Sequence, residues 1–292
     1  MYKLVAIDLD GTLLNSVGEV SEKTKKIIKE AKEKGVEIVL SSGRPISSTK
    51  TLALELGVDN YLISGNGAVV YDIKKDEIIY DKFLNKEQVF KIIDVCEANS
   101  IFYNIYTEDE VITKSLNYNV LFYHKENIKK IEEKRTHING VQDVKKYIEE
   151  SEKERFLKVT VCDESKMIFN GIIRKLREIG NIDILNVEHM SRKKFKIGTE
   201  IMSIEYHYTE ITNKNVNKWT AIEHLLEKLD IRKEEVAAIG DNINDKEMVE
   251  NAGLGVVMGN SNPIMKDLAD VIVSDNDSDG VYEAFEKYIL EE

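Results

Sequence analysis

Short apolar runs alternate with amphipathic stretches in the N-terminal part of the chain. The runs "LVAI", "VEIVL" and "YLIS" are short and continuous, as in strands buried within a parallel sheet. Between the first two, "EKTKKIIKEAKE" places Ile27, Ile28 and Ala31 on one helical face, and Ser21 precedes it as an N-cap. This order of strand, helix, strand, helix and strand predicts an α/β fold with a parallel sheet.

The same alternation returns near the C-terminus, with the strand-like runs "VAAIG", "LGVVM" and "DVIVS" and the helical segment "NKWTAIEHLLEKLDI". The stretch before it mixes strand-like and helix-like segments and is richer in Lys, Glu, Tyr and Ile. At its end we expect "FKIGTEIMSIEYHYTEIT" to form a strand with a bend. The sequence therefore predicts an α/β core formed by residues 1–82 and 209–292, with an α+β domain inserted at 83–208.

Composition and charge narrow the possible environments and partners. The chain has 292 residues, long enough for two domains of ordinary size or one large one. Hydrophobic residues make up 42% and charged residues 32%, as in soluble globular proteins. Its net charge of −12 repels nucleic-acid phosphates, which argues against a nucleic-acid partner. No uncharged stretch reaches the ~18 residues of a membrane span, and Asp8 comes too early for a secretory signal. We expect a cytoplasmic protein whose two cysteines stay reduced.

Four polar motifs follow predicted strands or begin the next helix. They are "DLDGT" (8–12), "SSGR" (41–44), "NKWT" (217–220) and "GDNIND" (240–245). Taken singly, "DLDGT", "SSGR" and "GDNIND" are also typical of turns or loops, because Asp, Asn, Ser and Gly are common turn residues. Lys218 of "NKWT" alone is typical of a solvated helix residue. In an open parallel sheet, however, ligands bind outside the carboxyl ends of the strands. Carboxylates, a hydroxyl, backbone amides and one lysine at that edge suit a phosphoryl group with a divalent cation.

Within the first motif, the two carboxylates are predicted to have different roles. Asp8 is the candidate nucleophile, since a carboxylate can attack phosphorus and split hydrolysis into two steps. Asp10 lies two residues further, so both side chains leave an extended backbone on the same side. There Asp10 can protonate the leaving oxygen and later deprotonate water. Gly11 permits the turn, and Thr12 can hydrogen-bond within it.

The fourth motif is the candidate metal site. Asp241 and Asp245 lie four residues apart around a strand-to-helix turn, and Mg²⁺ prefers oxygen ligands from one or two carboxylates, water and phosphate. The cation would cancel repulsion between Asp8 and an anionic phosphate. Asn244 can hydrogen-bond the phosphate or a water on the metal.

The second and third motifs are the candidate phosphate site. The Ser42 hydroxyl and the Gly43 amide can donate to phosphate oxygens as neutral groups. Lys218 can supply the positive charge that balances the phosphate and Asp8. The four motifs occurring together in this order favour a functional site over four unrelated turns.

These motifs resemble those of the haloacid dehalogenase-like (HAD) superfamily of phosphotransferases, and most closely the Cof-type phosphatases with a type-IIB cap. "DLDGTLL" resembles the first motif of the family, "SSGRP" the second, and "GDNINDKEMVENAGLGVVMGN" the fourth. The resemblance also implies that Arg44 and Asn66, the latter in "ISGNGAVVYD", lie near the phosphate or substrate. Lys218 matches the lysine of the family's third motif. Two residues depart from the family pattern: Ser42 stands where Thr is commoner, and Trp219 stands where a small residue usually follows that lysine.

The resemblance implies a Rossmann-like core and Mg²⁺-dependent hydrolysis of a phosphate monoester through an aspartyl-phosphate. It implies that the Asp8 side chain, the Asp10 main-chain carbonyl and Asp241 hold the metal, and that Asp245 orients a water on it. The domain inserted at 83–208 would be the cap that determines substrate specificity.

We therefore expect a phosphatase for a small phosphorylated metabolite. Sugar phosphates are the commonest substrate class among similar proteins, while nucleotide or cofactor phosphates such as FMN or pyridoxal phosphate stay open. Two alternatives remain: a phosphotransferase or phosphomutase on the same core, and a regulator that binds a phosphometabolite without turnover. Oligomeric state is not predicted.

Overall fold

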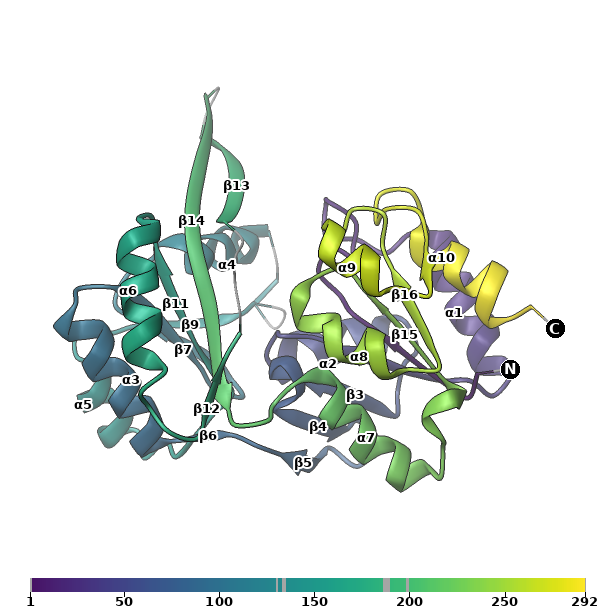
Figure 1. Ribbon diagram of the computed structural model, residues 1–292, viewed down its shortest axis with the longest axis horizontal. Coiled ribbons are helices and arrows are strands. Elements are labelled where there is room, and N and C mark those ends of the chain that lie inside the picture. The colour runs from purple at the N-terminus through teal and green to yellow at the C-terminus, as the bar shows by residue number, and fades with distance from the viewer. Residues whose placement is uncertain (1, 130, 133–134, 186–189, 198–199, 292) are drawn as a thin grey trace. The chain divides into compact units, whose positions relative to one another are not determined.

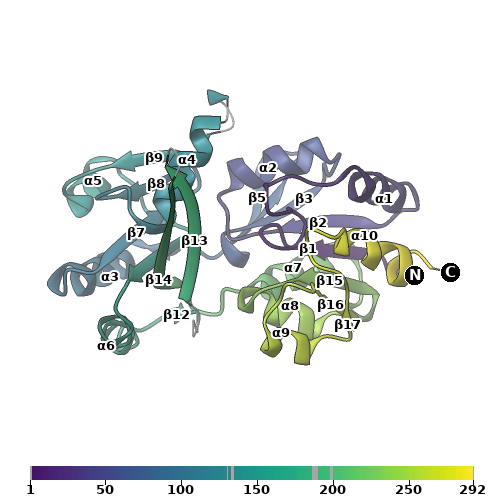
Figure 2. The same cartoon turned by 90° about the horizontal axis from the view of Figure 1, so that it is seen from above.

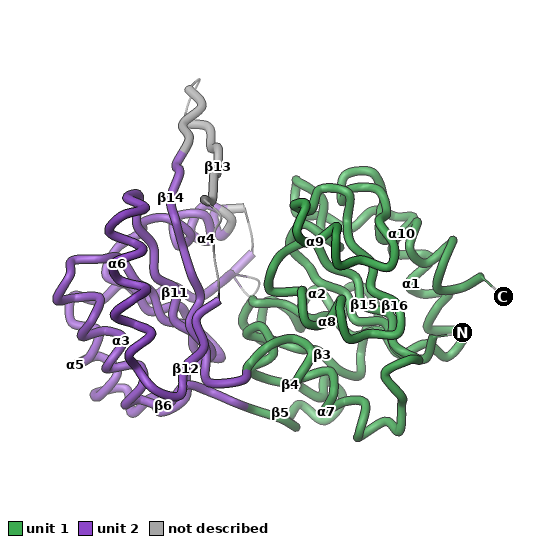
Figure 3. Tube along the Cα trace, in the orientation of Figure 1, with its two compact units in different colours: residues 1–81, 216–292 green, residues 82–215 purple. Residues whose placement is uncertain are grey.

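The computed structural model describes residues 2–129, 131–132, 135–185, 190–197 and 200–291. The chain divides into two compact units (Figure 3). Unit 1 consists of Met1–Asp81 and Val216–Glu292, and unit 2 of Lys82–Asn215. The return to unit 1 comes after residue 215, not after 208 as expected, because the last strand of unit 2 continues to Asn213.

Unit 1 contains an eight-stranded sheet with the order β17-β16-β15-β1-β2-β3-β4-β5. Its strands are β1 (Leu4–Ile7), β2 (Glu37–Ser41), β3 (Tyr61–Ser64), β4 (Val69–Asp72), β5 (Glu77–Asp81), β15 (Val236–Gly240), β16 (Leu254–Val257) and β17 (Val271–Ile272). The strands from β17 to β3 are parallel, whereas β4 and β5 are antiparallel additions. The predicted parallel α/β core is confirmed.

Helices cover both faces of this sheet (Figure 2). They are α1 (Glu22–Glu33), α2 (Ile46–Glu55), α7 (Lys218–Leu229), α8 (Lys246–Asn251), α9 (Pro263–Leu268) and α10 (Gly280–Ala284), the last followed by a π-helical turn over Phe285–Ile289. Alternate residues of β1 face opposite layers: Val5 and Ile7 pack with α1, α2 and α10, and Leu4 and Ala6 pack with α7 and α8. Burial on both faces explains why β1 is a continuous apolar run.

Unit 2 has a mixed sheet with the order β12-β14-β11-β7-β8-β9, to which β13 adds by pairing with β14, and a separate β10-β6 pair. Its elements are β6 (Leu84–Asn85), α3 (Lys86–Ala98), β7 (Phe102–Tyr106), β8 (Glu110–Thr113), α4 (Tyr118–Lys129), β9 (His137–Gly140), α5 (Val144–Glu150), β10 (Arg155–Phe156), β11 (Lys158–Asp163), α6 (Lys166–Leu176), β12 (Ile182–Ile184), β13 (Met190–Ile197) and β14 (Glu200–Asn213). The predicted α+β character of the insert is confirmed (Figure 1).

The single bent strand predicted over residues 195–212 is wrong. The described residues of this range belong to two strands, β13 and β14, which pair antiparallel from Met190 opposite His207 to Ile197 opposite Glu200. The strand propensity of these residues correctly indicated an extended conformation. It could not show that the chain forms two strands that pair with each other, because strand pairing depends on the tertiary structure.

Two other expectations concern the chain as a whole. Both cysteines, Cys96 and Cys162, are free buried thiols. Within the described part of the chain, the helices are all too short or too polar to cross a bilayer.

Candidate active site

A buried lysine joins two carboxylates at the carboxyl edge of the parallel strands. Asp8 directly follows β1, Lys218 is the first residue of α7, and Asp245 ends the short 3-10 turn before α8. The Lys218 Nζ donates to Asp8 Oδ1 at 2.5 Å and to Asp245 Oδ1 at 2.6 Å. All three residues are buried, with 4% or less of their surface exposed. The first, third and fourth motifs therefore meet at this edge.

The start of α7 is fixed by its cap and by a glycine contact. Asn217 is the N-cap, and its side chain accepts from the backbone N–H of Thr220. Gly67 has φ +99°, and a Cβ there would lie 2.0 Å from the Asn217 carbonyl oxygen. Only glycine permits this approach, which sets the position of the backbone that carries Lys218.

Asp241 completes a group of three acidic side chains. One carboxylate oxygen from each of Asp8, Asp241 and Asp245 lies within 4.8 Å of the others. Thr12 Oγ1 donates to Asp241 Oδ1 at 3.1 Å, and a Cβ on Gly11 would lie 2.4 Å from Asp241 Oδ2. Asp245 Oδ2 accepts from the backbone N–H groups of Asp241 and Asn242. Asp245 thus holds both Lys218 and the loop that carries Asp241.

The electrostatics of this group indicate a shortage of positive charge. Burial is the largest cause and repulsion from Asp245 the second, and together they raise the pKa of Asp8 to about 7, although Lys218 opposes the rise. Burial, followed by repulsion from Asp8 and Asp245, raises the pKa of Asp241 to about 8. Burial disfavours the Lys218 charge, but the two carboxylates outweigh burial and raise its pKa. Three carboxylates around one ammonium, all with oxygen donors, fit a hard divalent cation such as Mg²⁺.

The predicted phosphate-binding groups lie in the loops after β2 and β3. Ser42 is buried, and its carbonyl accepts from the Asn66 backbone N–H at 3.0 Å. Asn66 adopts φ 58°, and its Oδ1 accepts from Asn244 Nδ2 at 3.1 Å. Gly43 is half-buried between Ser42 and Arg44. Hydrogen bonds thus connect the second motif, Asn66 and the fourth motif.

Arg44 and Asp10 contact each other, which the sequence did not predict. The Arg44 guanidinium donates from Nε to Asp10 Oδ2 at 2.7 Å and from Nη2 to Asp10 Oδ1 at 2.5 Å. The Asp10 side chain is 60% exposed, whereas that of Asp8 is only 6% exposed. The two carboxylates of the first motif therefore occupy unlike environments, and Arg44 contacts the second of them.

Sequence reasoning did not single out Asn260. Its Nδ2 donates to the Gly11 carbonyl at 2.9 Å and lies 3.5 Å from Asp241 Oδ2. Asn260 follows β16, so the rule that polar residues gather at the carboxyl ends of strands applied to it as well. It fixes the turn that separates Asp10 from Thr12.

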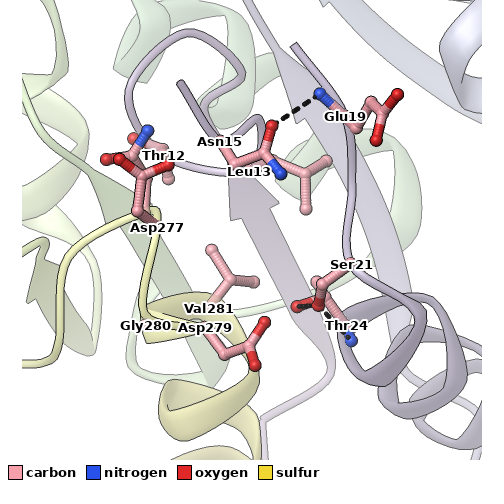
Figure 4. Close-up of a pocket in the computed structure, with 11 residues that line it drawn as sticks. Thr12, Leu13, Asn15, Glu19, Ser21, Thr24, Asp277, Asp279, Gly280 and Val281 are labelled. Atoms are coloured by element: carbon pink, nitrogen blue, oxygen red, sulfur yellow. Dashed lines mark hydrogen bonds between the residues drawn. The ribbon is translucent and has the colours of Figure 1, made fainter. Parts of the chain in front are cut away.

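A small pocket lies behind the first motif, between its loop and the loop before α10 (Figure 4). Thr12, Asn15, Glu19, Asp277 and Asp279 are among its lining residues. Its volume of about 50 Å³ is far below the roughly 300–1,000 Å³ of metabolite pockets. The carboxylates in its wall also repel anions, so this pocket is not the phosphate site.

Similarity to known proteins extends over almost the whole chain. The profile of the haloacid dehalogenase-like hydrolase family matches residues 5–285. Phosphatase YwpJ of Bacillus subtilis (strain 168) is 29% identical over 292 residues, covering 96% of this chain and 97% of the relative. The 5-amino-6-(5-phospho-D-ribitylamino)uracil phosphatase YcsE of the same organism is 29% identical over 288 residues, covering 99% and 96%.

Solved structures have a similar fold. A haloacid dehalogenase-like hydrolase from B. subtilis has a TM-score of 0.81 at 25% identity, covering 98% of this chain and 99% of that one. The HAD subclass IIB sugar phosphatase BT4131 has a TM-score of 0.75 at 21% identity, covering 98% of each chain. At that identity the second likeness concerns the fold.

Proposed function

We propose that this chain, which belongs to the haloacid dehalogenase-like hydrolases and is a phosphatase, hydrolyses a small phosphorylated metabolite with the help of Mg²⁺. The reaction passes through a phosphoryl group on Asp8. The observation that carries the proposal is the buried Asp8 carboxylate, held by Lys218 beside Asp241. A carboxylate fixed in this way is a nucleophile with one oxygen oriented and its charge balanced.

The cluster of acidic side chains would provide the ligands for the cation. Asp8, Asp241 and the main-chain carbonyl of Asp10 would hold Mg²⁺, and Asp245 would orient Asp8 through Lys218 and Asp241 through the loop amides. When bound, the ion supplies positive charge that offsets the repulsion between Asp8 and the phosphoryl oxygens.

The residues divide the reaction into two displacements. In the first, a carboxylate oxygen of Asp8 bonds to phosphorus while the bond to the leaving oxygen breaks, and Asp10 gives that oxygen its proton. In the second, Asp10 takes a proton from water, the water oxygen bonds to phosphorus, and the bond to Asp8 breaks. Inorganic phosphate leaves with Asp8 and Asp10 restored. Ser42, the Gly43 amide and Lys218 bind the phosphoryl oxygens throughout.

For the substrate, we propose a phosphorylated polyhydroxy compound, namely a sugar or ribityl phosphate. YcsE is named for a phosphoribityl substrate, and it aligns with 99% of this chain. Unit 2, inserted at the point in the chain where the resemblance places the cap, would select the leaving group and exclude water. Two unpaired buried thiols support a reducing, cytoplasmic location.

The test is a phosphate-release screen over about a hundred metabolite phosphates, with and without Mg²⁺. The Asp8→Asn variant is the blank and Asp267→Asn, an exposed change in α9, is the matched control. We expect Mg²⁺-dependent release that is lost in Asp8→Asn and kept in Asp267→Asn. Release by Asp8→Asn would refute Asp8 as the nucleophile, and binding without release would favour the regulator. Offering a second sugar as acceptor detects a phosphotransferase, which would transfer the phosphoryl group in place of releasing phosphate.

A further inference from the structure

The contact between Arg44 and Asp10 occupies both oxygens of the acid/base carboxylate. Each Asp10 oxygen accepts from a different nitrogen of one guanidinium, at 2.7 and 2.5 Å. A planar guanidinium matches a carboxylate or a phosphate in this two-point manner. In this arrangement neither oxygen of Asp10 can give a proton to a leaving group, because both are hydrogen-bond acceptors.

The backbone of Arg44 is anchored, although its side chain reaches the surface. Its N–H donates to Ser42 Oγ at 3.2 Å, and its carbonyl accepts from Ser64 Oγ at 2.6 Å and from the Gly65 N–H at 3.2 Å. The side chain retains 19% exposure. The guanidinium can therefore change partners by rotating its own side chain, without moving the phosphate-binding loop to which it belongs.

Stability does not explain the pair. The Asp10 side chain is 60% exposed, and ion pairs with such an exposed partner contribute little to folding. The pair instead joins the second motif, which binds phosphate in the proposed function, to the group that protonates the leaving oxygen.

We propose that Arg44 is a positioning residue for Asp10 and a sensor of the substrate phosphoryl group. Without substrate, it holds Asp10 by both oxygens. When a phosphate monoester binds at Ser42 and Gly43, one guanidinium N–H moves from Asp10 to a phosphoryl oxygen. The other N–H keeps Asp10 in orientation, and the freed oxygen, on a side chain that is 60% exposed, takes up a proton from solvent and faces the leaving group. This inference rests on the proposed function, because it takes Asp10 as the acid/base.

Leaving-group dependence separates this role from simple phosphate binding. The p-nitrophenolate group departs without a proton, whereas a sugar alkoxide needs one. The experiment measures kcat and KM for p-nitrophenyl phosphate and for glucose 6-phosphate, or the best sugar phosphate from the screen. The variants are Arg44→Ala and Arg44→Lys, each alone and combined with Asp10→Asn. Lys50→Ala is the matched control, because it removes another partly exposed cation of the same unit, which pairs with Asp76.

We expect Arg44→Ala to lower kcat about 10- to 100-fold for the sugar phosphate, part of the roughly 10²–10⁴-fold that general acid catalysis supplies. In the first turnover, which isolates the displacement that needs a leaving-group proton, we expect less than about a threefold loss of rate for p-nitrophenyl phosphate, and KM rises for both substrates. Arg44→Lys should recover KM but not kcat for the sugar phosphate, because an ammonium keeps the charge and loses the two-point geometry. In the Asp10→Asn background, Arg44→Ala should cost less than about threefold in kcat.

Three results would overturn the inference: equal losses of the first-turnover rate for both substrates, losses of kcat that multiply with Asp10→Asn, or no change on removing Arg44. Fluorescence of Trp219 reports whether each variant is folded, and Arg44→Lys provides the second test if Arg44→Ala is not. If the wild-type protein releases no phosphate from any ester, the proposed function fails together with this role. If it does release phosphate but the losses multiply, only the role of Arg44 fails.

Discussion

Without metal, the Asp241→Asn variant should be more stable than the wild-type protein. Once Mg²⁺ is added, the variant should be the less stable of the two. One oxygen of Asp241 lies within 4.8 Å of an oxygen from each of Asp8 and Asp245. At an effective dielectric constant of ~20, each such pair of like charges costs about 3.5 kcal/mol when both groups are ionised. Asparagine has nearly the same shape, can still accept from Thr12, and removes both repulsions.

The raised pKa of Asp241 gives an independent ceiling and the sign of the pH dependence. In the unfolded chain an aspartate ionises near pH ~3.9, whereas burial and repulsion raise the pKa of Asp241 to about 8 in the folded protein. Between these values the folded state binds more protons, so stability falls as pH rises. At ~1.4 kcal/mol per pH unit, the cost reaches about 5 kcal/mol at pH 7.5. Burying the asparagine amide and losing attraction to Lys218 offset part of this, and we expect a net gain of about 2 kcal/mol.

The assay is urea unfolding followed by the fluorescence of Trp219, the single tryptophan of the chain. It lies in α7 with 6% exposure, so it reports unit 1 specifically. In EDTA at pH 7.5, Asp241→Asn should exceed wild type by about 2 kcal/mol, and the gain should shrink at pH 5. The control Asp267→Asn, exposed in α9, should stay within ~0.5 kcal/mol.

Addition of MgCl₂ should reverse the order. A ligand at 100 times its dissociation constant stabilises the folded state by about 2.7 kcal/mol, and the variant has lost a charged ligand. If Asp241→Asn were less stable than wild type in EDTA, the repulsion inferred from the structure would be wrong. If Mg²⁺ stabilised both proteins equally, Asp241 would not be a metal ligand.

Two further changes test the supports of the site with the same fluorescence assay. Lys218→Met leaves the Asp8 carboxylate buried without its cation. We therefore expect the free energy of unfolding in EDTA to fall by about 3–5 kcal/mol, and phosphate release to be lost. A fall in the free energy of unfolding of less than ~1 kcal/mol would contradict the buried ion pair. Gly67→Ala places a Cβ 2.0 Å from the Asn217 carbonyl, and we expect it to cost at least ~2 kcal/mol more than Gly57→Ala, where φ is also positive but nothing lies within 4 Å. Equal losses for the two glycine variants would show that the close approach is not rigid.

The positions of the candidate catalytic motifs were predictable from sequence because one geometric rule governs them. The strands after which Asp8, Ser42 and Asp241 come are parallel neighbours in the sheet, so their carboxyl ends lie at one edge. Lys218 then reaches Asp8 from the start of α7, and Asp245 reaches Lys218 from the turn before α8. Here residue type, spacing and topology all point to the same arrangement.

What the sequence did not predict depends on partners and not on local preference. The pairing of β13 with β14 requires knowing which strands meet, and a strand-like pattern is the same for one bent strand and for two paired ones. The Arg44–Asp10 contact joins loops that follow different strands, and its geometry depends on rotamers set by loop packing. The residue types allowed Arg44 to bind phosphate or carboxylate, because both anions accept the same two N–H groups.

The unlike surroundings of Asp8 and Asp10 follow from how the chain leaves β1. Asp8 still donates its backbone N–H to the carbonyl of Ile239 in β15, so its side chain stays within the sheet edge. Gly11, at φ +90°, turns the chain against Asp241, and Asp10 before it is left facing solvent and Arg44. A nucleophile benefits from a fixed position and a dry site, whereas an acid/base must exchange protons with water between the two displacements. The turn at Gly11 therefore gives two identical side chains the separate environments that their proposed roles require.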